Sequence, residues 1–134
     1  GGTMKQYTKY LKQYLGRLDH APIVYVSAVT KQRVYELLDK ALAVAEEREK
    51  RVQTSALNDA VQAAMQEKRP PTTSSGAFVN INYVTQVREA PPVFAFFANH
   101  PEGIRTDYKR YLEGKLREAF GFEGVPLTLV FKEK

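Results

Sequence analysis

The stretch Phe78–Ala98, "FVNINYVTQVREAPPVFAFFA", carries two strand patterns separated by a turn that contains two prolines. Its first half alternates apolar with polar residues, the apolar ones being Val79, Ile81, Tyr83 and Val87 and the polar ones Asn80, Asn82 and Gln86. Such alternation predicts a strand with one buried face. Residues 93–98, "VFAFFA", are apolar on both faces and predict a central strand. We expect the two strands to pair as a hairpin around "REAPP".

Helical patterns flank this hairpin on both sides. Before it we expect a helix capped by Thr54, with a buried face made of Leu57, Ala60, Val61, Ala64 and Met65. After it we expect a helix capped by Thr106 and ended by Gly121, with an inner stripe made of Tyr108, Tyr111, Leu112, Leu116, Ala119 and Phe120. A last strand is predicted in residues 125–131, "VPLTLVF".

This order of elements predicts an α+β fold. From Thr54 onward the chain reads helix, strand, strand, helix, strand, and the second helix supplies the roughly dozen residues that a parallel crossover needs. We therefore expect a small mixed sheet of three strands with helices packed on one face. The strand and helix spacing of the aromatic residues favours core packing over base stacking, for Tyr25, Tyr83, Phe94, Phe96, Phe97, Tyr108 and Tyr111.

Residues 1–51 form a separate part in this prediction, and residues 52–134 form the domain described above. A helix is expected over residues 3–18 with Thr3 as its cap. The apolar run at residues 23–26 predicts a strand buried on both faces. A second helix is expected from near Gln32, with a buried stripe made of Val34, Leu37, Leu38, Ala41 and Ala45. Strand 23–26 would pair with a second copy of the chain, join the sheet, or be poorly ordered.

Composition narrows the classes of function. The chain has no cysteine and only two, widely separated histidines, so we expect no disulfide and no metal site. It has no apolar run near the ~20 residues of a membrane helix and no signal-peptide pattern, which favours a cytoplasmic protein. Its net charge of +5 favours anionic partners such as RNA. No pattern of nucleophile, base and acid points to catalysis.

Two groups of basic residues are candidates for RNA contact. Lys109, Arg110, Lys115 and Arg117 lie on the outer face of the helix that follows Thr106. Lys68 and Arg69 lie beside the mobile loop that the "EKRPPTTSSGA" stretch predicts. A solvated helix face would show the same residues, so both interpretations stay open.

"GFEG", Gly121–Gly124, matches the G-x-x-G pattern with which KH domains clamp a nucleic-acid backbone. In KH domains that loop joins two helices and is basic. Here it joins a helix to a strand and contains Glu123, so we expect a helix cap followed by a turn.

Four segments resemble the Der (EngA) family of bacterial double GTPases. They are "TMKQYTKYLKQYLGRLDHAPIVYVSAVTKQRV", "RVQTSALNDA", "INYVTQVREAPPVFAFFANHPEGI" and "YKRYLEGKLREAFGFEGVPLTLVFKEK". The resemblance implies the tail of the family's second GTPase domain followed by a KH-like domain. It also implies a role in maturation of the large ribosomal subunit, with rRNA as partner. Docking of the KH-like domain on the family's first GTPase domain is the alternative.

By the same resemblance, Ser27 and Ala28 correspond to the fifth guanine-nucleotide motif of the second GTPase domain. The G-x-x-x-x-G-K-[ST] loop, the D-x-x-G switch and the N-K-x-D motif are absent from this sequence. We therefore expect a fragment without GTPase activity and without a cofactor of its own. GTP and Mg²⁺ would belong to the whole parent protein.

Overall fold

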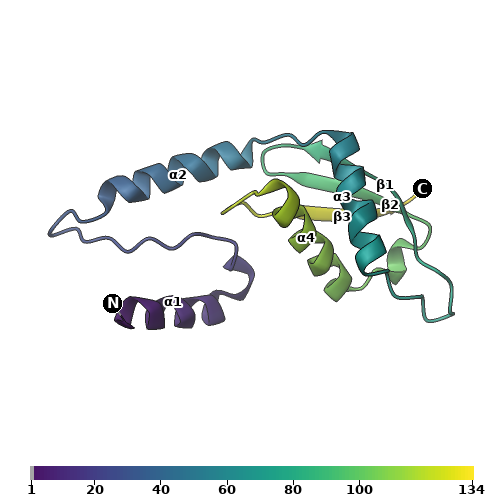
Figure 1. Cartoon of the computed structure of the whole chain (residues 1–134), viewed down its shortest axis with the longest axis horizontal. Helices are drawn as coiled ribbons and strands as arrows, with labels where there is room; N and C mark the ends of the chain where they lie inside the picture. The colour runs from purple at the N-terminus through teal and green to yellow at the C-terminus, as the bar shows by residue number, and fades with distance from the viewer. Residues whose placement is uncertain (1) are drawn as a thin grey trace.

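The computed structural model describes residues 2–134 and shows a small sheet domain with an N-terminal arm of helices and extended chain (Figure 1). The α-helices are α1 (Gly2–Leu15), α2 (Val34–Arg48), α3 (Thr54–Glu67) and α4 (Thr106–Phe120). The strands are β1 (Ile81–Arg88), β2 (Val93–Ala98) and β3 (Thr128–Glu133). Two short 3-10 helices, Gly16–Leu18 and Pro101–Gly103, follow α1 and β2.

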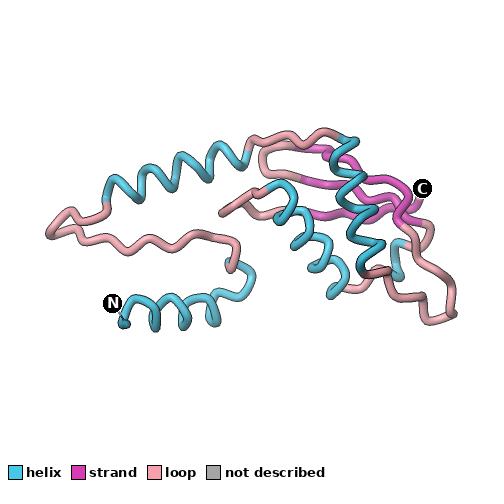
Figure 2. Tube along the Cα trace, in the orientation of Figure 1, coloured by secondary structure: helices cyan, strands magenta, loops and turns pink. Residues whose placement is uncertain are grey.

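The sheet has the order β1-β2-β3, with β2 in the centre. β1 pairs antiparallel with β2, and β2 pairs parallel with β3. The helix α4 forms the crossover between the two parallel strands, and α3 and α4 cover one face of the sheet (Figure 2). The predicted α+β class, the hairpin and the parallel crossover are confirmed.

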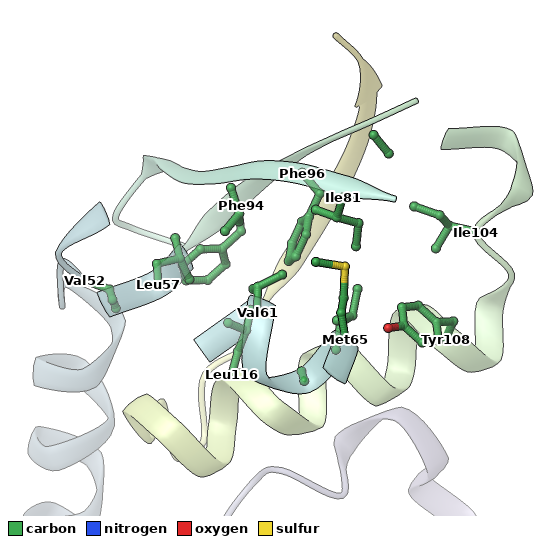
Figure 3. Close-up of a cluster of buried hydrophobic side chains, with 14 of the residues drawn as sticks. Val52, Leu57, Val61, Met65, Ile81, Phe94, Phe96, Ile104, Tyr108 and Leu116 are labelled. Carbon is green, nitrogen blue, oxygen red and sulfur yellow. The ribbon is translucent and has the colours of Figure 1, made fainter. Parts of the chain in front are cut away.

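The core lies between the sheet and the two helices that cover it (Figure 3). Phe94 and Phe96 of β2 are fully buried and face Val61 of α3 and Leu116 of α4. Most of the predicted helix stripes are buried, namely Leu57, Val61, Ala64, Met65, Tyr108, Leu112 and Leu116. Phe122 and Val125, in the turn after α4, complete the core, and sequence periodicity did not identify Phe122.

The first strand departs from the predicted alternation. Its pairing shifts between Ile81 and Tyr83 and again between Gln86 and Arg88, so that one extra residue enters β1 at each place. A bulge of this kind reverses which face the following residues occupy. Tyr83 and Val87, predicted to be buried, are therefore 42% and 57% exposed. Val84 and Gln86 take the inward positions, and Gln86, predicted on the polar face, is buried.

Two amide side chains satisfy backbone groups beside β1. The Asn58 side chain of α3 accepts a hydrogen bond from the Val84 amide and donates one to the Val84 carbonyl, both at 2.9 Å. Gln86 accepts one from the Val52 amide at 2.8 Å and donates one to the Lys50 carbonyl at 3.0 Å. Unpaired backbone groups on an edge strand invite pairing with another chain. The Asn58 bonds therefore satisfy the edge of β1 at Val84. The Gln86 bonds attach the linker between α2 and α3 to the same strand.

The N-terminal arm differs most from its prediction. Residues 23–26 form an extended segment outside the sheet, so the prediction of a buried strand is wrong within the described structure. Likewise α2 has no buried residue, and Leu37 and Leu38 of its predicted inner stripe are 43% and 53% exposed. The described residues provide no second layer to cover these apolar side chains. Pairing of 23–26 with a second copy stays a prediction.

Helix starts also differ by a residue or two. Thr54 and Thr106 are the first helical residues rather than the caps, which are Gln53 and Arg105. Thr3 lies inside α1, and α2 begins at Val34. None of the three described N-caps of α2, α3 and α4 makes a side-chain capping bond. Packing of the apolar faces therefore determines these helices more than capping does.

The turn Gly121–Gly124 attaches the arm to the sheet domain. The Glu47 carboxylate accepts a hydrogen bond from the Phe122 amide at 2.7 Å, and Lys50 donates one to the Phe120 carbonyl at 2.6 Å. The Gly124 amide donates to the His20 carbonyl at 2.9 Å. A Cβ at Gly124 would lie 2.6 Å from Val44 Cγ2, and its φ of +77° suits glycine. We refer to these contacts as the GFEG joint.

Replacing Asn58 with Leu should lower the free energy of unfolding by about 1–3 kcal/mol, because the Val84 amide and carbonyl would lose their partners. Urea unfolding followed by circular dichroism measures this change. The control is Gln66→Ala on the exposed side of the same helix, expected within about 0.5 kcal/mol of the wild type. Equal stabilities of the two variants would contradict the role of Asn58.

Gly124→Ala should weaken the GFEG joint by about 1–3 kcal/mol, because its Cβ would overlap Val44 and the residue would keep a positive φ. Hydrogen exchange of the Phe122 and Gly124 amides measures the loss of protection. The matched control is Gly114→Ala in α4, where a Cβ meets open space. That change should stabilise the chain by about 1 kcal/mol through helix propensity.

Glu47→Gln should destabilise the chain in a pH-dependent way. The hydrogen bond from Lys50, with help from the Phe122 amide, lowers the pKa of Glu47 below its ordinary 4.5. A lowered pKa gives stability that is present above pH 4.5 and lost as the pH falls through the folded value. Urea unfolding at pH 7 should show a loss of about 1 kcal/mol, and the difference should disappear near pH 3. A difference that persists at pH 3 would contradict the ionic contribution.

Candidate nucleic-acid interface

Helix α4 presents Lys109 and Arg110 beside a groove. Tyr108 and Leu112 are buried in the core, while Lys109 and Arg110 between them face outward. The groove lies between α4 and the chain that enters β3, and its lining residues are Thr106, Lys109, Arg110, Glu113, Leu127 and Leu129. The Lys109 ammonium lies 5.0 Å from the ring centre of Phe131. Arg110 is exposed, and its side chain forms no hydrogen bond or ion pair within residues 2–134.

Lys115, also predicted as an RNA contact, is neutralised locally. Its ammonium lies 2.7 Å from the Glu67 carboxylate and 3.3 Å from that of Glu118. The hydrogen bond to Glu67 is the main cause that raises the pKa of Lys115. A phosphate would have to compete with two carboxylates for this cation. Lys115 is therefore a poorer phosphate ligand than Lys109 or Arg110.

Arg117 has a structural role. Its guanidinium donates to the Phe122 and Val125 carbonyls, both at 2.8 Å, and its side chain is 19% exposed. Burial is the main cause that lowers the pKa of Arg117. Both backbone oxygens belong to the turn after α4, so Arg117 holds the GFEG joint rather than facing solvent.

The remaining candidates lie near the end of α3. The Lys68 ammonium is 5.2 Å from the Tyr111 ring centre, and that of Lys115 is 5.7 Å from the same ring. The structure thus brings these two predicted residues together. Arg69 lines a different groove, together with Phe78 and Asn80.

Ser27 and Ala28 lie in the loop between the extended segment and α2. The Ser27 amide donates to the Gln32 carbonyl at 3.2 Å, and the Ser27 hydroxyl accepts from the Thr30 amide at 3.3 Å. These bonds fold residues 27–32 into a closed turn. A guanine-binding role for this turn stays a prediction.

Three of the four amides in the Gly121–Gly124 turn are occupied. Those of Gly121, Phe122 and Gly124 donate to the Arg117 carbonyl, the Glu47 carboxylate and the His20 carbonyl. The Phe122 side chain is fully buried. A phosphate clamp needs free amides, so this turn is a helix cap and a joint, as its position after a helix predicts.

The face of the sheet away from α3 and α4 is a feature that the sequence did not reveal. Strand register places its residues in three rows that run across β1, β2 and β3. The rows are Tyr83–Phe97–Lys132, Thr85–Ala95–Val130 and Arg88–Val93–Thr128. We call these nine residues the open sheet face. Tyr83 belongs to it because of the bulge in β1, which strict alternation cannot predict.

Neither a metal-binding cluster nor a membrane-spanning helix is present among residues 2–134. Within residues 2–134, the His, Asp and Glu side chains form no group of three or more that could hold a metal ion. None of the described helices is both long and apolar enough to cross a membrane.

Comparisons with known proteins agree with this architecture. The sequence model of the family described as "KH-domain-like of EngA bacterial GTPase enzymes, C-terminal" matches residues 51–132. GTPase Der of Moorella thermoacetica is 45% identical over 130 residues, which are 97% of this chain and 30% of that protein. GTPase Der of Chlorobium phaeobacteroides (strain BS1) is 41% identical over 132 residues, 98% of this chain and 30% of that protein.

The chain thus spans about 30% of the length of these curated relatives. The predicted resemblance is confirmed over nearly the whole sequence by these relatives, and the KH-domain-like family model accounts for residues 51–132 of it. The chain belongs to the KH-domain-like family found at the C-terminus of EngA bacterial GTPases.

Proposed function

We propose that this chain is the RNA-binding module with which a Der-type GTPase of the bacterial cytoplasm engages rRNA during assembly of the large ribosomal subunit. The observation that carries the proposal is the position of Lys109 and Arg110 beside the groove between α4 and β3. Binding of single-stranded nucleic acid is typical of KH modules, although a fold by itself does not fix function.

The local charge around these two residues favours a phosphate ligand. Glu113 is the one acidic side chain among the residues that line the groove, and it lies 3.9 Å from Arg117. Lys109 stays beside the Phe131 ring, which positions its ammonium without neutralising it. Arg110 offers a planar guanidinium suited to bidentate contact with phosphate oxygens.

Nucleotide binding belongs to the whole parent protein in this proposal. Ser27 and Ala28 could contribute backbone groups to the guanine site, but the sequence contains no phosphate-binding loop and no Mg²⁺-binding motif. The residues present therefore do not make a GTP site by themselves.

Docking on the first GTPase domain of the parent protein is the second candidate. The exposure of Tyr83 and Val87 on the side of the sheet that the helices leave uncovered favours it. Apolar docking depends weakly on salt, whereas binding through Lys and Arg to phosphates weakens steeply as salt rises. The two candidates therefore differ in a measurable way.

Changing Lys109 and Arg110 together to Gln should weaken binding of single-stranded rRNA fragments. Loss of two phosphate contacts should reduce the slope of log K against log salt by about 1.4, at about 0.7 for each contact. Fluorescence anisotropy of labelled RNA between 50 and 200 mM salt measures both changes. Lys115→Gln is the matched control, because Glu67 and Glu118 already neutralise that ammonium.

The affinity and slope of Lys115→Gln should stay close to those of the wild type. If wild-type affinity barely changes with salt, or if the double variant binds as tightly as the wild type, the proposed contact is wrong. Tight, salt-insensitive binding of the chain to the first GTPase domain, without RNA binding, would favour the second candidate.

A further inference from the structure

An exposed aromatic pair lies on the open sheet face. Tyr83 and Phe97 are direct cross-strand partners, and their ring centres are 6.2 Å apart with an angle of 36° between the ring planes. Tyr83 is 42% exposed and Phe97 is half-buried. Helices α3 and α4 cover the opposite face, so neither helix shields these rings (Figure 2). The pair is therefore accessible to a flat ligand.

The bulge in β1 is what places Tyr83 beside Phe97. Ile81 faces the core, and regular alternation would put Tyr83 on the same side. The extra residue between them turns Tyr83 to the outside, where it pairs with Phe97. Bulges commonly redirect a side chain at functional sites, and this one leaves a large aromatic ring in solvent. Core packing gains nothing from that placement.

Charge on the open sheet face is positive. Lys132 lies next to Phe97 in the same row, and Arg88 lies in the row at the other end of the face. These two rows are four residues apart along β2, about 13 Å. None of the nine residues of this face is acidic. The face thus has aromatic rings and two cations with no carboxylate among them.

Cations also lie beside the edge strand β3 on the face of the sheet that α4 covers. Phe131 precedes Lys132 in β3, and its ring lies 5.0 Å from the Lys109 ammonium. Consecutive strand residues point to opposite faces, so Lys109 and Lys132 flank β3 from the two sides. A polyanion that contacts Lys109 and Arg110 can therefore continue around β3 onto the open sheet face.

We propose that the open sheet face is a stacking platform for unpaired bases of single-stranded RNA. Tyr83 and Phe97 contact the bases, and Lys132 and Arg88 contact the phosphates. This inference rests on the proposed RNA-binding function and names the surface that holds the bases. Aromatic rings can stack on any base, so the platform selects unpaired bases without a preference for sequence. The absence of carboxylates and the cations on both sides of β3 favour RNA over a protein partner.

Tyr83→Ser tests the platform. Loss of one stacking contact should weaken binding of an unstructured 12-nucleotide RNA about 5- to 150-fold, as expected for a base–aromatic contact. Tyr83→Phe keeps the ring and should bind as the wild type does. The control is Tyr35→Ser, on α2 and 83% exposed, which should leave the affinity unchanged.

The measurement is anisotropy of the labelled RNA with the full chain, with circular dichroism melting to confirm that each variant folds. Weaker binding by Tyr83→Ser but not by Tyr83→Phe supports the platform. Equal binding by Tyr83→Ser and wild type, while the Lys109/Arg110 double variant is weakened, overturns the platform and leaves the proposed function standing. No RNA binding by the wild type overturns both. Loss of binding to the first GTPase domain instead of RNA assigns the face to protein docking and also overturns the platform.

Discussion

The structure depends on the burial of β2 between two neighbouring strands and two covering helices. Both of its edges are used for pairing, with β1 on one side and β3 on the other. Its inward side chains, Phe94 and Phe96, are fully removed from solvent. Burying two Phe side chains contributes several kcal/mol, which is a large part of the net stability of a small domain. Helices α3 and α4 are positioned by the need to cover these rings.

The sequence predicted the parts of the fold that follow from a regular period. Stripes at three- and four-residue spacing marked α3 and α4, and the run 93–98 marked β2, because hydrophobic burial imposes those periods. The two bulges in β1 were not predictable, since an inserted residue breaks the period without a composition signal. The prediction of a buried strand at residues 23–26 was wrong for another reason. A strand that is apolar on both faces is buried only where other elements cover both faces, and the described residues do not supply that cover.

The candidate site was less predictable than the fold, because the availability of a cation depends on distant partners. Lys115 meets Glu67, 48 residues away, and Arg117 meets the carbonyls of Phe122 and Val125. From the sequence alone, the outer face of one helix carries four basic residues with no sign that their environments differ. These are Lys109, Arg110, Lys115 and Arg117. Tertiary packing divides them into two that face a groove and two that serve the fold. The same packing exposed Tyr83, which the sequence assigned to the core.

The GFEG joint connects these observations, because it links the arm to the helix that carries the candidate cations. Glu47 of α2 accepts a hydrogen bond from the Phe122 amide, and Arg117 of α4 donates one to the Phe122 carbonyl. One buried residue thus holds both helices through its two backbone groups. Side chains that are buried and hydrogen-bonded resist small displacements, since interiors are close-packed. Glu47 and Arg117 therefore attach α2 and the C-terminal end of α4 to the same backbone segment, and Lys109 and Arg110 lie nearer the start of α4.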